Sequence, residues 1–249
     1  QESLDEVERA SKAAGKSGAS IGCHCFMKDV SERLKAAQKV REAAEMKADF
    51  AAVVSHELRT PLSSIKTGID MVWDGSAGPI TEEQRHFLDV SKRNVDRLAR
   101  LINEVLDFQQ LESGRMEFQM QPHDLNEVVL EAAQTFAAPA KEKGVELVTE
   151  LAEGAPPVVC DRDKILEVVI NLVNNAIKFA TQGKVTLRTQ SMGDRLRITV
   201  QDQGPGIRAE DQGKLFQSFV RLQASGKKTR GSGLGLAISR RIVETHGGQ

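Results

Sequence analysis

The chain has 249 residues, a net charge of −1 and 40% hydrophobic residues, a composition typical of a soluble globular protein with one or two domains. The near-neutral balance argues against a nucleic-acid-binding protein. No apolar run approaches the roughly 20 residues that a membrane helix needs, and residues 1–20 lack the apolar core of a signal peptide. Three cysteines, at positions 23, 25 and 160, argue against a disulfide framework and fit the reducing cytoplasm.

The N-terminal region has a weak pattern. Residues 1–20 are rich in Ser, Gly, Lys and Glu and show no period. Larger apolar groups at alternate positions of Ile21–Met27 predict a short strand, and Asp29 or Ser31 would cap the helix that follows. The Cys-His-Cys triplet at 23–25 resembles a metal motif, but alternate strand residues point to opposite faces and no second ligand pair is present. We therefore expect no metal there.

Two helices with a coiled-coil pattern come next. Apolar residues recur in steps of four and three up to Trp73, small at first and bulkier after Leu58. The turn cluster Asp74–Pro79 and the helix start Thr81–Gln84 lead into a second such helix, which ends near Ser113. One hairpin cannot bury both seams, so we expect two chains to form a homodimeric four-helix bundle. The predicted seams comprise Ala44, Ala48, Ala51, Ser55, Leu58, Leu62, Ile65, Ile69 and Val72, and Phe87, Ser91, Asn94, Leu98, Leu101, Val105 and Phe108.

Beyond Gly114 the pattern changes to mixed α and β. Gly193 and Asp194 form the turn of a predicted hairpin. The order of elements predicts an α+β protein, in which an antiparallel helical hairpin precedes an α/β sandwich. Helices are expected at 125–143, 163–180 and 234–245, and strands at 145–151, 158–160, 184–191 and 195–202.

Three segments of this second domain have the chemistry of a nucleotide pocket. In Asn171–Phe179, the amide oxygen of Asn175 can bind magnesium from within a helix. Lys178 lies on a neighbouring face of that helix, within reach of a phosphate. In Asp202–Gly206, the carboxylate of Asp202 stands at a strand end and can accept from the exocyclic amine of adenine.

Glycines complete the predicted pocket. Gly204 and Gly206 let the backbone turn tightly beneath a flat base. Gly231, Gly233 and Gly235 precede a helix whose N-terminus favours anionic oxygens. Taken singly, such motifs are more often a solvated helix face or a simple turn. Their occurrence together, in this order, carries the prediction.

Upstream, Ser55–Leu62 presents a histidine on the first long helix. His56 lies at the edge of the predicted seam, where a second domain can reach it. A neutral imidazole is nucleophilic, and Glu57 can orient it or take its proton. Thr60 shares its helical face, and Pro61 cannot donate a backbone hydrogen bond and should bend the helix. Considered alone, His56 would be an ordinary surface histidine.

These segments resemble the H, N, G1, F and G2 boxes of sensor histidine kinases. In that order the matching segments are Ser55–Leu62, Asn171–Phe179, Asp202–Gly206, Leu215–Phe219 and Gly231–Gly235. The resemblance runs from about residue 30 to the C-terminus. It implies a dimerisation and phosphoacceptor hairpin over residues 34–113 and a Bergerat-type ATP-binding domain over residues 114–249.

The resemblance also implies roles. His56 would be the phosphoacceptor, Glu57 its partner, and Thr60 the residue that places a water for dephosphorylating a response regulator aspartate. Asn175 would be the Mg²⁺ ligand, and residues 207–230 the lid over ATP. A response regulator receiver domain would accept the phosphoryl group. The implied ATP-binding residues are Asn171, Asn175, Lys178, Asp202, Gly204, Gly206, Gly231, Gly233, Leu234 and Gly235.

Type II topoisomerases, MutL proteins and Hsp90 chaperones have a similar ATP-binding fold. They resemble one another in a glutamate, four residues before the metal-binding asparagine, that activates water. This chain has Asn171 at that position, and an amide is a poor base, so ATP should be kept for the histidine. Two alternatives stay open, namely an ATPase that dimerises through the helices and a scaffold without catalysis.

The two ends depart from the kinase pattern. Gly22–Arg33 resembles the last strand and exit of PAS domains, which makes residues 1–33 a remnant of an upstream sensory domain with its linker. Similar kinases continue for one or two strands beyond His246–Gln249, so we expect an unpaired sheet edge. Because the chain begins with Gln1, we expect a fragment whose parent can carry a membrane anchor.

Overall fold

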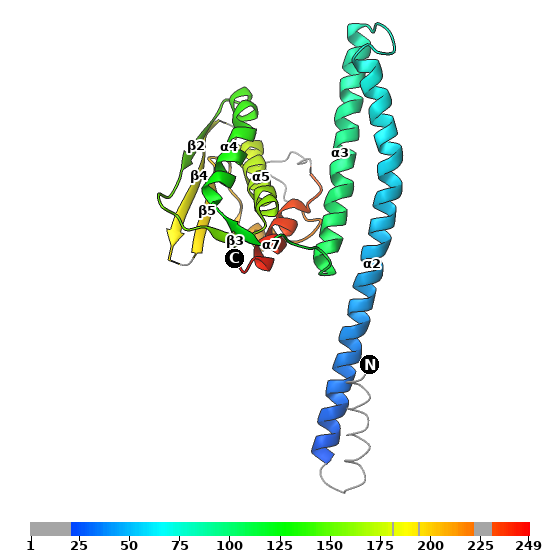
Figure 1. Ribbon diagram of the computed structural model, residues 1–249, viewed down its shortest axis with the longest axis vertical. Helices are drawn as coiled ribbons and strands as arrows, with labels where there is room; N and C mark the ends of the chain where they lie inside the picture. The colour runs from blue at the N-terminus through cyan, green and yellow to red at the C-terminus, as the bar shows by residue number, and fades with distance from the viewer. Residues whose placement is uncertain (1–20, 181, 194, 222–230) are drawn as a thin grey trace.

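The computed structural model describes the backbone of residues 21–180, 182–193, 195–221 and 231–249, and side chains from residue 33 onward, apart from 36, 37, 40, 41 and 45. A long helical hairpin stands beside a less elongated mixed α and β domain (Figure 1). The mixed domain lies on the side of the second helix, which separates it from the first. No helix in the described part of the chain has an apolar stretch long enough to cross a membrane.

The hairpin consists of α2 (Ile21–Trp73) and α3 (Glu82–Glu112). Thr81 caps α3 through a capping box, in which its hydroxyl accepts from the N–H of Gln84 at 3.2 Å and its own N–H donates to the Gln84 side chain at 2.8 Å. The predicted start of this helix is therefore confirmed. α2 continues through Pro61, whose missing N–H interrupts only one hydrogen bond of a long ladder.

One chain buries only part of the predicted seams. Ala48, Ser55 and Leu62 on α2 are less than 9% exposed. Polar contacts between the helices include Arg59–Asn103 at 2.9 Å, Lys66–Asp96 at 2.6 Å and Trp73–Asp89 at 2.6 Å. Five other seam positions leave large apolar side chains facing solvent, namely Leu58, Ile65, Phe87, Leu98 and Val105.

The predicted strand at Ile21–Met27 is wrong, because this segment forms the first turns of α2. Asp29 and Ser31 are consequently interior helix residues and not caps. Alternation over seven residues is a weak signal, and adding a residue to an existing helix is far easier than starting a new element. The strand that the PAS-like resemblance implied is therefore absent from Ile21–Met27, and residues 1–20 lie outside the described structure.

The second domain contains two small sheets and three longer helices. β2 pairs in parallel with β4, β4 pairs antiparallel with β5, and β1 pairs antiparallel with β3. α4, α5 and α7 lie between the larger sheet and α3 (Figure 1). The elements are β1 (Gln121–His123), α4 (Leu125–Glu142), β2 (Val145–Glu150), β3 (Val158–Cys160), α5 (Arg162–Phe179), β4 (Gly183–Met192), β5 (Arg195–Gln201), α6 (Ala209–Gln212) and α7 (Gly235–Thr245).

The predicted elements of this domain are confirmed to within a few residues. Met192 pairs with Arg195, so the β4–β5 hairpin is confirmed, although residue 194 lies outside the described residues. β1 and α6 were not predicted. β1 has only three residues, one of which is proline, so its pairing with β3 depends on contacts that no local pattern records. The core is formed by branched residues that are fully buried, including Val128, Val129, Val169, Val173, Val185 and Leu187.

Candidate nucleotide and phosphoacceptor sites

Asn171 lies at a contact between α5 and the first half of α7. Its Nδ2 atom donates to Ser239 Oγ of α7 at 2.9 Å. A Cβ atom at Gly235 would lie 2.6 Å from Asn171 Oδ1, so a side chain at the first residue of α7 would displace the Asn171 amide from its present position. Asn171 stands at the position where the related ATPases carry their water-activating glutamate. In this chain its amide joins α5 to α7.

Asn175 and Lys178 lie farther along α5, towards its C-terminal end. Asn175 is partly buried. Lys178 Nζ lies 5.1 Å from the centroid of the Phe179 ring. A Cβ atom at Gly231 would lie 3.7 Å from the same Nζ atom. Burial and, secondarily, the positive charge of Arg221 lower the pKa of Lys178. An anion bound here would be stabilised, because the partly desolvated Lys178 ammonium group and the Arg221 guanidinium both attract negative charge.

The turn that follows β5 is held against this end of α5. Gly204 N–H donates to Asp202 Oδ1 at 2.7 Å. A Cβ atom at Gly204 would lie 2.7 Å from Asp202 Oδ1 and 3.2 Å from the carbonyl oxygen of Phe179. Gly206 has a φ of +72°, which an L side chain rarely adopts. The Asp202 carboxylate is thus exposed at the strand end, with one oxygen already engaged by the turn.

The third segment, Gly231–Gly235, leads into the N-terminus of α7. Gly233 has a φ of +79°, and a Cβ atom there would lie 2.9 Å from both Phe219 C and Val220 O. Leu234 is 1% exposed and anchors the segment in the core. The N-cap residue Leu234 makes no side-chain cap to α7, so among the described residues the first N–H groups of α7 are left for an anionic oxygen. Phe219, with a φ of +64°, donates its N–H to Gly233 O at 3.0 Å.

His56 lies apart from these segments, on α2. Its side chain is 76% exposed, and Nδ1 lies 3.5 Å from Glu57 Oε1. Thr60 Oγ1 lies 3.4 Å from the carbonyl oxygen of His56, as expected for a residue one turn later. The structure therefore brings the three predicted nucleotide segments together around the C-terminal half of α5 and the start of α7. It leaves the histidine on the helix beyond α3 (Figure 1).

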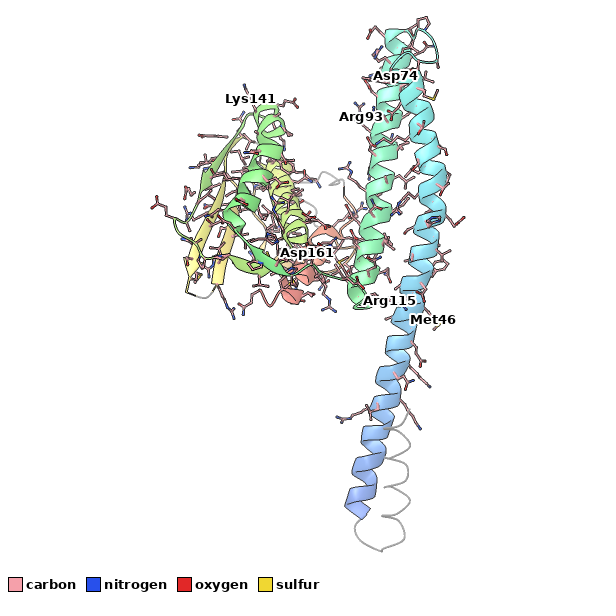
Figure 2. The ribbon with its side chains drawn as sticks, in the orientation of Figure 1. Met46, Asp74, Arg93, Arg115, Lys141 and Asp161 are labelled. Atoms are coloured by element: carbon pink, nitrogen blue, oxygen red, sulfur yellow. The ribbon has the colours of Figure 1, made fainter. Side chains whose placement is uncertain are left out.

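The two parts of the chain meet at the lower end of α3. Phe108 and Phe219 contact edge to face with ring centroids 6.1 Å apart. Lys164 Nζ of α5 lies 4.0 Å from Asp107 Oδ1, and burial raises the pKa of Asp107 despite this cation. Figure 2 shows Arg115 at the base of the hairpin, where it pairs with Asp49 of α2.

Metal binding at this site would depend on few protein ligands. Among the residues that the structure describes, no group of three or more His, Cys, Asp or Glu side chains is arranged to hold a metal ion. Mg²⁺ in nucleotide sites is held by one or two protein oxygens together with the phosphates. The single amide oxygen of Asn175, beside Lys178 and the uncapped start of α7, fits that kind of site.

Two family models match the chain in tandem. The model described as His Kinase A (phospho-acceptor) domain matches residues 46–114. The model described as Histidine kinase-, DNA gyrase B-, and HSP90-like ATPase matches residues 160–249. The chain belongs to the sensor histidine kinases. The two matched ranges contain the phosphoacceptor segment and all the nucleotide segments described above.

Relatives of this kinase region support the assignment. The circadian input-output histidine kinase CikA of Synechococcus elongatus is 34% identical over 221 residues, which cover 87% of this chain and 29% of CikA. Full-length ShkA in complex with AMPPNP has a TM-score of 0.70 and 30% identity, covering 81% of this chain and 42% of that one. ThkA in complex with the response regulator TrrA has a TM-score of 0.55 and 26% identity, covering 87% and 60%. The chain thus spans less than two thirds of each.

Three residues of the catalytic domain that support the site were not identified from the sequence. They are Ser239, which accepts from Asn171, and the pair Asp161 and His246, which join the other ends of α5 and α7. Their partners lie 68 and 85 positions away in the chain. No helical or strand period contains such a pairing.

Proposed function

We propose that this histidine kinase region transfers the γ-phosphoryl group of MgATP to His56 and passes it on to an aspartate of a response regulator. One observation carries the proposal. A highly exposed imidazole with a carboxylate beside Nδ1 stands on a hairpin tethered to a domain that gathers the three segments predicted to bind a nucleotide.

The nucleotide roles follow from the positions of the side chains. Asp202 receives the adenine amine, and the tight turn at Gly204 and Gly206 keeps side chains away from the base. Lys178 and the first N–H groups of α7 bind phosphate oxygens. Asn171 holds α7 against α5 through Ser239. When bound to Asn175, Mg²⁺ would neutralise charge on the phosphates.

The histidine chemistry uses both ring nitrogens. With Glu57 facing Nδ1, the neutral ring carries its proton there and presents the Nε2 lone pair to the γ-phosphorus. A P–N bond forms as the bond from the γ-phosphorus to the bridging oxygen breaks, and ADP leaves. The Nδ1 proton passes to Glu57, which leaves a phosphohistidine with an uncharged ring and an anionic phosphoryl group. Domain movement must precede this step, because the nucleotide segments pack beside α3 and His56 lies on α2.

Dimerisation accounts for the apolar residues that one chain leaves exposed. Leu58 and Ile65 on α2 and Phe87, Leu98 and Val105 on α3 are between 36% and 63% exposed. Pairing two hairpins would bury them in a four-helix bundle. A receiver domain would then dock on this bundle to collect the phosphoryl group, as a cytoplasmic partner. Upstream, the long N-terminal part of α2 would connect the bundle to a sensory domain.

Incubation with γ-labelled MgATP tests the transfer. We expect acid-labile, base-stable label on the wild type and none on His56→Gln, while His86→Gln, an exposed histidine on α3, keeps the label. Unchanged labelling of His56→Gln would contradict the assignment. Release of free phosphate without labelled protein would favour the ATPase alternative, and absence of nucleotide binding would favour the scaffold.

The metal ligand is tested by a matched pair of amides on α5. Asn175→Asp should change the magnesium dependence of nucleotide binding, with the hairpin still dimeric. Asn174→Asp adds the same charge at the neighbouring, exposed position and should leave that dependence unchanged. Equal behaviour of the two variants in titrations of a fluorescent ATP analogue would refute the proposed role of Asn175.

A further inference from the structure

His246 occupies the C-cap of α7, where the helix ends in a fixed geometry. Gly247 has a φ of +73° and donates its N–H to Glu244 O at 3.0 Å, while Gly248 N–H donates to Val243 O at 2.9 Å. These two bonds form a Schellman motif. The backbone that carries the His246 ring is therefore held in one conformation.

Each nitrogen of the His246 ring has a partner. Nδ1 lies 2.7 Å from the carbonyl oxygen of Ile242, and Nε2 lies 2.9 Å from the backbone nitrogen of Asp161. The carbonyl can only accept and the backbone N–H can only donate, so this arrangement requires a neutral ring protonated at Nδ1. The Phe118 ring meets it at 5.1 Å and 87°, which fixes the plane of the imidazole.

Asp161 is a junction of three segments in the catalytic domain, where Figure 2 labels it. It is 8% exposed and caps α5, accepting from Lys164 N–H at 3.1 Å. It also accepts at 2.9 Å from the N–H of Gln119, in the segment that leaves α3. Burial opposes ionisation of Asp161, but hydrogen bonds from the N–H groups of Gln119 and Lys164 lower its pKa.

α5 and α7 pack together through buried apolar residues, and side-chain hydrogen bonds join them at two places. The Asn171–Ser239 bond lies near the nucleotide segments, and the Asp161–His246 bond lies at the opposite end. Asp161 and Asn175 are about 21 Å apart along the axis of α5. With one of two attachments removed, α7 can pivot about the other, and its first turn then shifts relative to Asn175.

We propose that His246 is a positioning residue for nucleotide binding. Its Nε2 atom, as an acceptor, fixes the angle between α5, which carries Asn175 and Lys178, and α7, whose N-terminus would bind the phosphates. The inference rests on the proposed nucleotide site. His246 itself touches no substrate and acts through Asp161.

Three variants separate positioning from general destabilisation. His246→Leu removes the acceptor, and His246→Gln keeps an oxygen at the place of Nε2. Thr189→Val is the matched control, because Thr189 is 3% exposed and its Oγ1 also accepts a backbone N–H, that of Ala152, at 2.8 Å. Both His246→Leu and Thr189→Val leave one backbone N–H of the same domain without its acceptor. Thr189→Val also removes the donor to Asn126 Oδ1 at 2.6 Å, so it should lower the melting temperature at least as much as His246→Leu.

The affinity for AMPPNP with Mg²⁺ is measured by calorimetry at a temperature where every variant is folded. We expect the dissociation constant to rise about tenfold in His246→Leu, and to stay within about twofold of wild type in His246→Gln and Thr189→Val. Wild-type affinity in His246→Leu, or an equal loss in Thr189→Val, would overturn the inference.

The ring itself gives a readout that does not require nucleotide. Two-bond ¹H–¹⁵N correlation spectra of the histidine side chains should show one ring in the Nδ1–H form that His246→Gln eliminates. If that ring is protonated at Nε2, the inference is wrong regardless of the affinities measured for AMPPNP. If the spectrum agrees but the wild type binds no AMPPNP, the proposed nucleotide site fails instead.

Discussion

Replacing Gly233 by alanine tests whether the approach of residues 231–235 to Phe219 builds the nucleotide site. A positive φ disfavours any L side chain by about 1–2 kcal/mol. At Gly233 the new Cβ atom would also lie 2.9 Å from Phe219 C and from Val220 O. These are backbone atoms that cannot rotate away, so overpacking adds about 1–3 kcal/mol. We therefore expect Gly233→Ala to destabilise the domain by about 3 kcal/mol.

Gly144→Ala is the matched control for this substitution. Gly144 has a similar φ, +71°, but a Cβ atom there would meet nothing within 4 Å. Gly144→Ala should lower the free energy of unfolding by about 1 kcal/mol and the melting temperature by about 3 °C. The expected drop in melting temperature for Gly233→Ala is about 9 °C. Circular dichroism measures both, and an ATP-analogue titration should show weakened binding only for Gly233→Ala. Equal losses of stability, with equal affinities, would refute the proposed contact.

Three further changes test separate parts of the structure. Asp161→Asn should be less stable than wild type above about pH 4, and the difference in unfolding free energy should vanish as the pH falls through the lowered pKa of Asp161; a pH-independent difference in urea titrations would be contrary evidence. Asn171→Glu should lower the free energy of unfolding by about 1–3 kcal/mol, because the longer side chain crowds Gly235. We expect the variant to gain no ATP hydrolysis, and faster hydrolysis in a coupled phosphate-release assay would contradict this. Thr81→Ala should cost the hairpin about 1 kcal/mol, and an unchanged thermal transition would argue against the capping box.

The local features of the site could be predicted from the sequence because each depends on neighbouring residues. Thr81 and Gln84 are three positions apart, so their capping box is visible as a pattern. The end of β5, expected at Asp202 and found at Gln201, and the start of α7 after Gly233 followed from apolar periodicity interrupted by glycine. The same reasoning failed at Ile21–Met27, where a short alternation competes with a helix that extends from its C-terminal side.

The sequence by itself determined the order of chemical groups, from the imidazole at 56 to the glycines before α7, and with them the family and the two-part architecture. Only the tertiary structure decided which distant groups meet. It joined Asn171 to Ser239 and Asp161 to His246, and it placed Phe219 against Phe108 on α3. Periodicity records how a residue relates to its own helix or strand. Contacts between elements depend on how the side chains of the whole core pack together, which no local sequence pattern records.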